Sequence, residues 1–599
     1  MMVKSSVILL LLLVKISFFG ASAYAQGESE LEPMVVVETR SPVPLSEASP
    51  WVTRIPGKDL IERQIYNLSD ALRSVPGMAI ARTGQLGSQT SLFSRGGESN
   101  HVTFLYEGRR LNGGFSGTYN LGELSTLGSS SIEILKGSSS LNGANAMGGT
   151  VHMRNELLLV DGYESNVGLS FGSFDTLTSN YSSRFKNENW SGNFSFSSLD
   201  TENDRPHSKF ESLSSSFLIE NQLNDGLTVN FLGLGYDNYL GSNFNKNYPV
   251  NPNNYQETVH FLISPQLEVK TDSWDASLNY SYSEDEINYT PSWNMLYWTE
   301  QENVDFFSSL LLNDRSTLQF GLGYSTTRFL REGNFLNSWE QTYAAIGFRH
   351  EITKDTELDG NVRYGDYSDF KSAETYDLKA RTSISENFSV YAKFATGFAP
   401  PGALDLYSYG MGYPGNPDLL AEESRNYELG FSRMDQSLRH KLTMSVFFTE
   451  YKNLINASWG AKPENIGESE SVGIEVSSQN QISENLSIVP SITYVRSKDL
   501  DSNYNFLPKR PEFFGSFTAT YGINAVNVGT QMNFKNNTKE NATSENDDYV
   551  IVRLFGNYEI SDDLIFHARI ENLFDEKYEE VIGYPALGRA VHAGLTYNF

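Results

Sequence analysis

Hydrophobic and polar residues alternate along much of this chain with the two-residue period of a β-strand. In Val591–Phe599 every odd-numbered residue is apolar, and His592 and Asn598 lie on the other face. The same alternation runs through Leu564–Ile570. Nine residues is about the length that a tilted membrane strand needs. The pattern therefore predicts strands that have one apolar and one polar face.

Membrane strands must close into a barrel, because lipid offers no water to an open sheet edge. The chain contains 7 Trp, 33 Tyr and 37 Phe, which suits the aromatic girdles of membrane barrels. A soluble β-sandwich or propeller would also alternate and is the alternative. The terminal Phe599 favours the barrel, since such an ending resembles the signal read by outer-membrane assembly machinery.

The first 25 residues have the pattern of a secretory signal peptide. Lys4 supplies a positive charge, Val7–Val14 is apolar, and Ala23–Ala25 is a small-x-small cleavage site. We therefore expect the mature chain to begin at Gln26. No later apolar run reaches the 18–20 residues of a membrane-spanning helix.

The net charge and the cysteine content of the chain exclude some classes of partner and of metal site. The formal net charge of −28 argues against a nucleic-acid partner, which requires phosphate neutralisation. The acidic exterior is either simply solvated or suited to divalent cations. Cysteine is absent, which excludes disulfides and thiolate metal sites.

A small β-rich domain precedes the alternating region. Glycine-rich turns separate short strands at Val102–Tyr106, Ser131–Leu135 and Thr150–Met153, and no phosphate-loop pattern occurs. Before them, residues 59–76 have apolar positions at helical spacing and predict a helix. Asp70 and Arg73 are interpreted as ordinary charges on its surface.

Four ordered motifs in this domain resemble the plug of TonB-dependent outer-membrane receptors: R-G-G at 95–97, Y-E-G-R-R-L-N at 106–112, I-E-I-L-K-G at 132–137 and N-A-M-G-G at 145–149. The stretch that begins with R-G-G is most similar to cobalamin transporters. The resemblance implies an all-β membrane protein, a 22-stranded antiparallel transmembrane β-barrel with an N-terminal globular plug domain in its lumen. The implied division is a signal peptide (1–25), a periplasmic leader (26–45), the plug (46–160) and the barrel (164–599).

Further motifs of the same family follow in order along the barrel. They are F-A-T-G-F-A-P-P-G at 394–402, G-N-P-D-L-L-A-E-E-S at 415–424, E-N-I-G-E-S-E-S-V-G-I-E at 464–475, I-E-N-L-F-D-E-K-Y at 570–578 and G-Y-P-A-L-G-R at 583–589. They identify the family more than its ligand.

A valine-rich segment between signal and plug resembles the TonB box, by which the inner-membrane protein TonB grips these receptors. Such a segment pairs as an added strand with the partner's sheet edge. Its residues are Glu32, Pro33, Met34, Val35, Val36, Val37, Glu38 and Thr39.

Two basic plug residues pair with two glutamates of the barrel wall in this family. The matching positions are Arg95, Lys136, Glu428 and Glu475. Removing one member would leave another charge without a partner, although solvated lumen charges are the alternative. Lys136 replaces the arginine often found there and lacks its bidentate fork.

Two early loops are candidates for calcium, because their oxygen ligands are of the type this ion prefers and cobalamin transporters carry calcium in comparable loops. The residues are Glu202, Asn203, Asp204, Asp237 and Asn238. Plain solvated loop acids are the alternative, since the first loop lacks a dense aspartate run.

The ligand itself is not fixed by these motifs. No histidine lies between the F-A-P-P and N-P-D-L motifs, where related haem receptors carry one, so haem is disfavoured. Outer-loop aromatics are candidate contacts or girdle residues, and none is singled out. They are Tyr289, Trp293, Tyr297, Trp298, Tyr407, Tyr409 and Tyr413.

The resemblance predicts TonB-dependent active transport in the outer membrane of a Gram-negative-type bacterium. Cobalamin is the first candidate ligand and a ferric siderophore the alternative. We expect a monomer in contact with outer-membrane lipid, with no required cofactor apart from the candidate calcium. An open porin would not explain the plug motifs, and no catalytic constellation supports an enzyme.

Overall fold

The computed structural model describes residues 33–45, 47–111, 115, 117–126, 131–241, 245–247, 251–290, 295–331, 334–369, 371–407, 414–435, 439–456, 461–501 and 506–599. The predicted signal peptide, Glu32, Trp293, Tyr409 and Tyr413 lie outside these residues. Within them, no helix is both long and apolar enough to cross a membrane.

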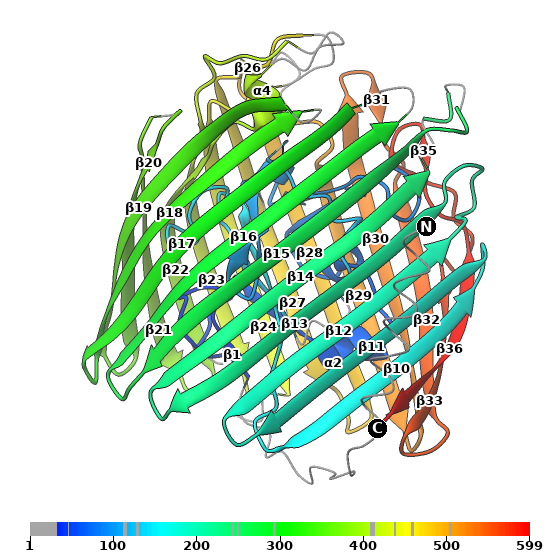
Figure 1. Ribbon diagram of the computed structural model, residues 1–599, viewed down its shortest axis with the longest axis horizontal. Coiled ribbons are helices and arrows are strands. Elements are labelled where there is room, and N and C mark those ends of the chain that lie inside the picture. Colours follow the sequence, from blue (N-terminus) through cyan, green and yellow to red (C-terminus); the bar gives the residue numbers. More distant parts are fainter. Residues whose placement is uncertain are drawn as a thin grey trace.

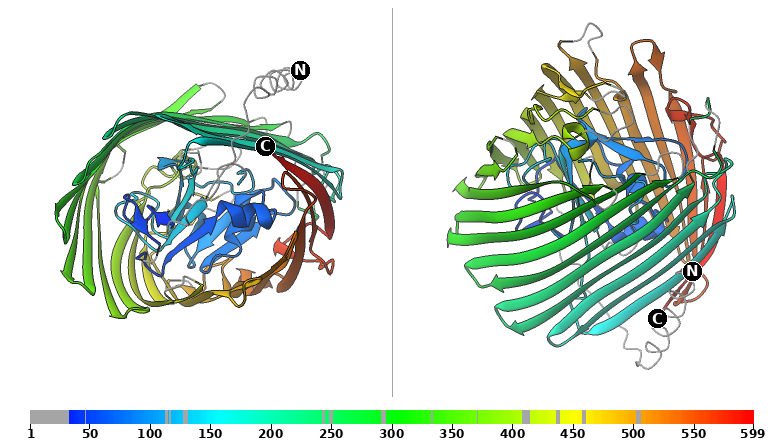
Figure 2. Two further views of the ribbon diagram at one scale, coloured as in Figure 1. Left: turned by 90° about the horizontal axis from the view of Figure 1, so that it is seen from below. Right: turned by 45° about the horizontal axis from the view of Figure 1, so that its top comes forward.

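Twenty-two long antiparallel strands close into a barrel in the described part of the chain. Each pairs with its neighbours in sequence order, and β36 closes the ring by pairing with β10. The short β31 (Ser544–Glu545) extends β30 at one end. Figures 1 and 2 show the tilted strands surrounding the N-terminal part of the chain. The predicted barrel is therefore confirmed, with its first strand beginning at Gly162 rather than at 164.

The first half of the wall consists of β10 (Gly162–Gly172), β11 (Thr176–Asn187), β12 (Trp190–Thr201), β13 (Phe210–Asn224), β14 (Leu227–Gly241), β15 (Tyr255–Lys270), β16 (Trp274–Thr290), β17 (Met295–Asn313), β18 (Ser316–Arg331), β19 (Asn334–Thr353) and β20 (Thr356–Tyr367). The second half consists of β21 (Ala373–Ser385), β22 (Phe388–Ala399), β23 (Glu422–Met434), β24 (His440–Lys452), β27 (Glu468–Gln481), β28 (Leu486–Asp499), β29 (Pro511–Ile523), β30 (Val526–Asn541), β32 (Tyr549–Glu559), β33 (Leu564–Glu571) and β36 (Ala590–Asn598). Short pairs β25–β26 (Ile455–Asn456, Glu464–Asn465) and β34–β35 (Glu579–Val581, Tyr584–Pro585) lie in its loops.

The alternation predicted at the C-terminus is present in the last strand. Val591, Leu595 and Tyr597 are 44–50% exposed on the outside, whereas His592 is 4% exposed and faces the lumen. Apolar side chains outward and polar ones inward is the arrangement of a lipid-embedded barrel.

The barrel has a short-turn end and a long-loop end. Short connections occur at both ends of the barrel: residues 173–175 join β10 to β11 at one end, and residues 188–189 join β11 to β12 at the other. Long connections, such as 400–421 and 572–589, occur at one end only. Outer-membrane barrels have short periplasmic turns and long outer loops. The end that carries α4 (Ala403–Leu406), at the top of Figure 1, is therefore extracellular.

The plug fills the lumen with a five-stranded sheet of order β3-β8-β9-β6-β7. Its strands are β3 (Val52–Pro56), β8 (Ser131–Lys136), β9 (Gly149–Arg154), β6 (Val102–Tyr106) and β7 (Arg109–Arg110). Only the β6–β9 pairing is parallel. A hairpin of β4 (Met78–Arg82) and β5 (Thr90–Ser94) and the short helix η1 (Ser99–His101) complete it. The strands predicted at 102–106, 131–135 and 150–153 are confirmed.

The single helix predicted over 59–76 is wrong. Two short helices form instead, α2 (Gly57–Glu62) and α3 (Leu68–Leu72). Gln64 between them has φ +52°, a left-handed conformation that ends a helix. Asn67 then caps α3 by accepting a hydrogen bond from the Ser69 N–H at 2.9 Å.

Candidate functional site

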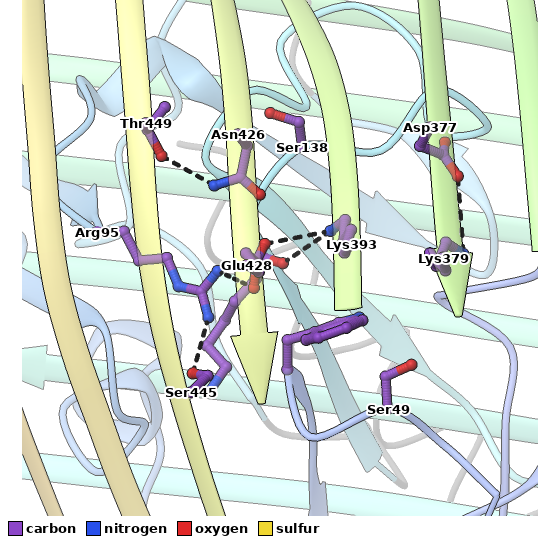
Figure 3. A network of polar contacts seen from close by, with 12 residues as sticks. Ser49, Arg95, Ser138, Asp377, Lys379, Lys393, Asn426, Glu428, Ser445 and Thr449 are labelled. Atoms are coloured by element: carbon purple, nitrogen blue, oxygen red, sulfur yellow. Dashed lines mark hydrogen bonds and ion pairs between the residues drawn. The ribbon is translucent and has the colours of Figure 1, made fainter. Parts of the chain in front are cut away.

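Four charged residues singled out in the sequence meet at one point of the interface between plug and barrel. Arg95 donates from Nε and Nη2 to both oxygens of Glu475, at 2.7 and 3.0 Å. Its Nη1 lies 2.7 Å from Glu428 Oε2 (Figure 3). Lys136 Nζ donates to Glu475 Oε2 at 2.9 Å. The structure thus brings all four side chains together, and each is 2% exposed.

A fifth charge completes this cluster and was missed in the sequence. Lys393 of β22 lies 3.5 Å from Glu428 Oε1 and is 4% exposed (Figure 3). Its Nζ also donates to the Lys136 carbonyl at 3.4 Å. Nothing in the local sequence distinguishes it from other lumen-facing polar residues, because its partner comes from the neighbouring strand. Three cations therefore share two carboxylates.

Because the cluster is buried, the pKa values of Arg95 and Lys136 depend on the carboxylates beside them. Burial alone would lower the pKa of Arg95, but Glu428 and Glu475 raise it above its usual range. Burial lowers the pKa of Lys136 despite the nearby Glu475. Lys136 offers a single point contact where an arginine fork would make two. The cluster anchors the plug to strands β22, β23 and β27.

The predicted box segment is folded back into the periplasmic half of the plug. Its strand β1 (Met34–Val35) pairs with β2 (Val43–Pro44). Val35 and Val37 are 0% and 2% exposed and pack in a hydrophobic cluster with Trp51 and Tyr391. The valines therefore hold the segment against both plug and wall.

Polar contacts fix the end of this segment. The Ser49 hydroxyl donates to Glu38 Oε1 at 2.5 Å and Trp51 Nε1 donates to the same oxygen at 3.2 Å. Lys379 lies 3.7 Å away. Burial alone would raise the pKa of Glu38, but Lys379 and Ser49 hold it below its usual value. Just beyond, Arg40 forms an ion pair with Asp305 of the wall.

A cavity of about 70 Å³ lies at the extracellular end, between the plug apex and the wall. Its described lining is composed mainly of neutral polar and aromatic groups, with one arginine and no carboxylate. The Gln301 side-chain oxygen is buried there and accepts no hydrogen bond from the described residues. We call this space the vestibule cavity. Its lining includes Arg110, Asn145, Gln301, Thr327, Trp339 and Gln341.

The described candidate aromatics divide between the two faces of the wall. Tyr297 packs against Phe115 of the plug with ring centroids 4.6 Å apart and ring planes inclined by 43°, and Tyr289 and Tyr407 pack against the same cluster. Trp298, the next residue along β17, faces outward and donates to Glu286 at 2.8 Å. Three of the candidates thus lie beside the vestibule, and one does not.

The structure places the side chains of the candidate calcium residues apart. Asp237 is exposed, whereas its neighbour Asn238 faces the lumen and donates to the Glu123 carbonyl at 3.3 Å. Asp204 accepts from the Gly588 N–H at 3.0 Å. Glu202 lies 3.7 Å from Lys209, and Asn203 donates to the Ser208 carbonyl. Within the described ranges, no three acidic or histidine side chains are grouped as a metal site. Calcium binding stays a prediction.

Arg73 is more than a surface charge, which corrects the sequence interpretation of that residue, whereas the Asp70 side chain is 41% exposed. Arg73 Nη1 lies 2.6 Å from Glu580 of an outer loop, whose side chain is 2% exposed. Asp70 pairs with Arg82 at 3.0 Å. The Arg73–Glu580 ion pair therefore joins the end of α3 to the β33–β36 loop, and the Arg82 N–H of the plug hairpin also donates to Glu580, at 2.7 Å. Long-range packing creates these contacts, and local spacing does not reveal them.

A larger cavity of about 190 Å³ lies along the opposite seam between plug and wall. Its walls include Arg553 and Arg569, which both donate to Glu571, at 2.7 and 3.1 Å. The Arg569 guanidinium also stacks on Tyr66. Arg553 and Arg569 therefore already have Glu571 as an ion-pair partner.

Glu123 gives a testable pH dependence. It accepts from Gln256 and Thr258 at 3.0 and 3.2 Å, and burial, with Asp285 nearby, raises its pKa to about 7. Between pH 4.5 and 7 the folded state keeps a proton that the unfolded chain has lost, so stability falls as pH rises. We expect Glu123→Gln to stabilise the protein by about 1–3 kcal/mol at pH 8 and by much less at pH 4.5. Thermal unfolding in detergent at both pH values measures this, and an equal effect at both would contradict it.

Comparison with known proteins identifies the family. The model of the family "TonB dependent receptor-like, beta-barrel" matches residues 87–573. The chain belongs to the TonB-dependent receptor family. Proteins of this family are outer-membrane receptors and transporters of Gram-negative bacteria, coupled to TonB and binding small ligands.

Two curated relatives of this receptor match it along nearly their whole length. Vitamin B12 transporter BtuB of Photobacterium profundum is 24% identical, covering 97% of each chain. The protein of the same name from Vibrio vulnificus is 22% identical, covering 96% of this chain and 97% of its own.

Solved structures share the fold of the receptor. The siderophore receptor PirA from Acinetobacter baumannii aligns with a TM-score of 0.78 at 16% identity, covering 92% of this chain and 98% of its own. The ferric yersiniabactin uptake receptor FyuA from Yersinia pestis aligns with a TM-score of 0.79 at 16% identity, covering 92% and 97%. At this identity the likeness concerns architecture alone.

Proposed function

We propose that this receptor takes up cobalamin across the outer membrane by TonB-dependent active transport. The observation that carries the proposal is the described lining of the vestibule cavity, which includes three side-chain amides, one arginine and no carboxylate. Cobalamin is bulky and carries many amide groups. A cavity of this size accepts one polar arm of such a ligand rather than the whole molecule. The unpaired Gln301 oxygen offers an acceptor for an amide N–H.

The ferric-siderophore alternative requires different chemistry. Siderophore complexes are mostly anionic and call for several arginines or lysines. The described lining of the vestibule cavity has one, Arg110, which already donates to the Ala144 carbonyl at 2.9 Å. The match with two proteins named vitamin B12 transporters over nearly the full length also supports cobalamin.

The test is equilibrium binding of cyanocobalamin to the purified barrel, beside a panel of ferric siderophores. We expect tight, saturable binding of cyanocobalamin alone. Binding of one siderophore and not of cyanocobalamin would overturn the assignment. Each titration is repeated after calcium chelation, because the predicted loop site requires that chelation weaken binding.

A substitution in the vestibule cavity tests the role of its lining. Gln301→Leu keeps the approximate volume but removes the free acceptor, and we expect cyanocobalamin affinity to fall about 10-fold. Gln266→Leu is the matched control, since Gln266 lies in the periplasmic half of β15, where it donates to Glu268 at 2.8 Å. Equal losses in both variants would contradict a specific contact at Gln301.

A further inference from the structure

The larger cavity between plug and wall has an excess of positive charge on one side. We call this space of about 190 Å³ the seam cavity. Arg553 and Arg569 of the wall both donate to Glu571, at 2.7 and 3.1 Å. The three side chains come from the paired strands β32 and β33, and all of them line the cavity. One carboxylate therefore faces two guanidinium groups, which leaves one positive charge in excess.

The other charged groups of the described lining do not remove this excess. Arg73 pairs with Glu580 at 2.6 Å, and Arg82 pairs with Asp70 at 3.0 Å. Glu123 accepts hydrogen bonds from neutral donors, and burial raises its pKa to about 7, so it is only about half ionised at neutral pH. The excess positive charge therefore stays on the β32–β33 side of the cavity.

Arg569 has a donor that the protein does not use. The residue is 8% exposed, and its buried Nη1 donates no hydrogen bond to the described residues. The Tyr66 ring covers one face of the guanidinium, with 4.9 Å between Cζ and the ring centroid. A buried charged donor without an acceptor is costly. The Nη1 group therefore requires an acceptor from outside the chain.

Two neighbouring side chains also carry polar atoms without partners. His592 of β36 lies opposite Arg569 across the strand pair and is 4% exposed, and its Nδ1 has no partner among the described residues. Gln64 of the plug donates to the carbonyl of Ala568, the residue before Arg569, at 3.1 Å. Its own Oε1 accepts nothing from the described residues. Both side chains line the seam cavity.

These groups favour an oxyanion over water alone. The cavity is far larger than the roughly 10–15 Å³ that one water molecule needs, and water does not neutralise the excess charge. Guanidinium groups form short, strong hydrogen bonds with phosphate oxygens. A hydrogenphosphate ion also has an O–H donor for an acceptor such as Gln64 Oε1, whereas a carboxylate offers acceptors alone.

We propose that the seam cavity binds a hydrogenphosphate ion, held by Arg569 and His592 of the wall and by Gln64 of the plug. The site is separate from the vestibule cavity and goes beyond the proposed transport of cobalamin. Because its contacts come from both parts of the receptor, the bound ion ties the plug to the β33–β36 side of the barrel.

The test is calorimetric titration of inorganic phosphate into the purified full-length receptor in detergent, at pH 7.5 and constant ionic strength set with chloride. We expect one saturable site. Arg569→Met should weaken phosphate binding at least 10-fold, because the charged donor is lost. Glu571→Gln should strengthen it about 10-fold, since the carboxylate that competes with the ion is removed and the excess charge grows. The two variants thus change the affinity in opposite directions.

Arg349→Met is the matched control. Arg349 is another arginine of the lumen, but it lies in the periplasmic half of the wall and has two carboxylates, Glu357 and Asp359, at 3.6 and 3.5 Å. Its loss should change phosphate affinity less than about 2-fold. In thermal unfolding, phosphate should raise the midpoint of the unchanged receptor and of Glu571→Gln, but not that of Arg569→Met.

Three results would overturn the site. They are the absence of saturable phosphate binding to the unchanged receptor, an equal loss of affinity in Arg569→Met and Arg349→Met, and weaker binding in Glu571→Gln. The predicted gain of affinity in Glu571→Gln keeps the test decisive even where Arg569→Met does not fold. The titration contains no cargo, so its outcome is independent of the cobalamin assignment.

Discussion

Deleting Met34–Val37 is expected to abolish uptake of cyanocobalamin and to leave its equilibrium binding unchanged. The segment lies in the periplasmic half of the plug, away from the vestibule cavity, so the ligand contacts survive its removal. Its backbone is the part that an added-strand partner would grip, and without it no pulling force reaches the plug. Uptake of labelled cyanocobalamin by intact cells should fall to the level of cells that lack TonB, with an unchanged binding curve for the purified protein.

Two further variants sharpen this experiment. A deletion of equal length upstream, of residues 27–30, should leave uptake intact. Val36→Pro removes one backbone donor and keeps the chain length, so it should also block uptake, since proline cannot donate to a strand pair. Normal uptake after deletion of Met34–Val37 would show that another segment couples the receptor.

The architecture was predictable from the sequence because it follows from a repeated local pattern. Alternation in Val591–Phe599 and Leu564–Ile570 indicated lipid-facing strands, and both are strands of the closed barrel. The family motifs also identified the four charges that meet at the anchor of the plug. Each of those charges lies in a short motif that can be matched to the family's pattern residue by residue.

Other features depend on which strands become neighbours after folding. Lys393 joins the charge cluster only because β22 pairs with β23, which places it opposite Glu428. Glu133 lies in a strand that is buried along its whole length, and its carboxylate accepts from the Val36 and Val37 N–H groups, almost 100 positions earlier in the chain. The sequence around Arg73 indicates a surface charge, because its partner Glu580 lies in an outer loop far along the chain. Spacing along the chain contains none of this information.

Removing the Glu475 carboxylate is expected to weaken the anchor between plug and barrel more than any other single charge change in the cluster. Glu475 binds Arg95 through two hydrogen bonds and Lys136 through a third. Glu475→Gln leaves three buried cations around Glu428 alone. Breaking a buried ion pair by removing one partner costs about 3–5 kcal/mol. Urea unfolding in detergent, together with protease resistance of the plug, measures the loss.

The matched control lies on the same strand, β27. Glu470 pairs with Lys498 at 3.1 Å, with both side chains about one-quarter exposed, so Glu470→Gln should cost only about 0–1 kcal/mol. Adding Lys136→Met to Glu475→Gln should recover part of the stability, because Arg95 then keeps Glu428 and one unpaired cation is gone. A double variant no more stable than Glu475→Gln would mean that the Lys136 charge is not what the lost carboxylate neutralises.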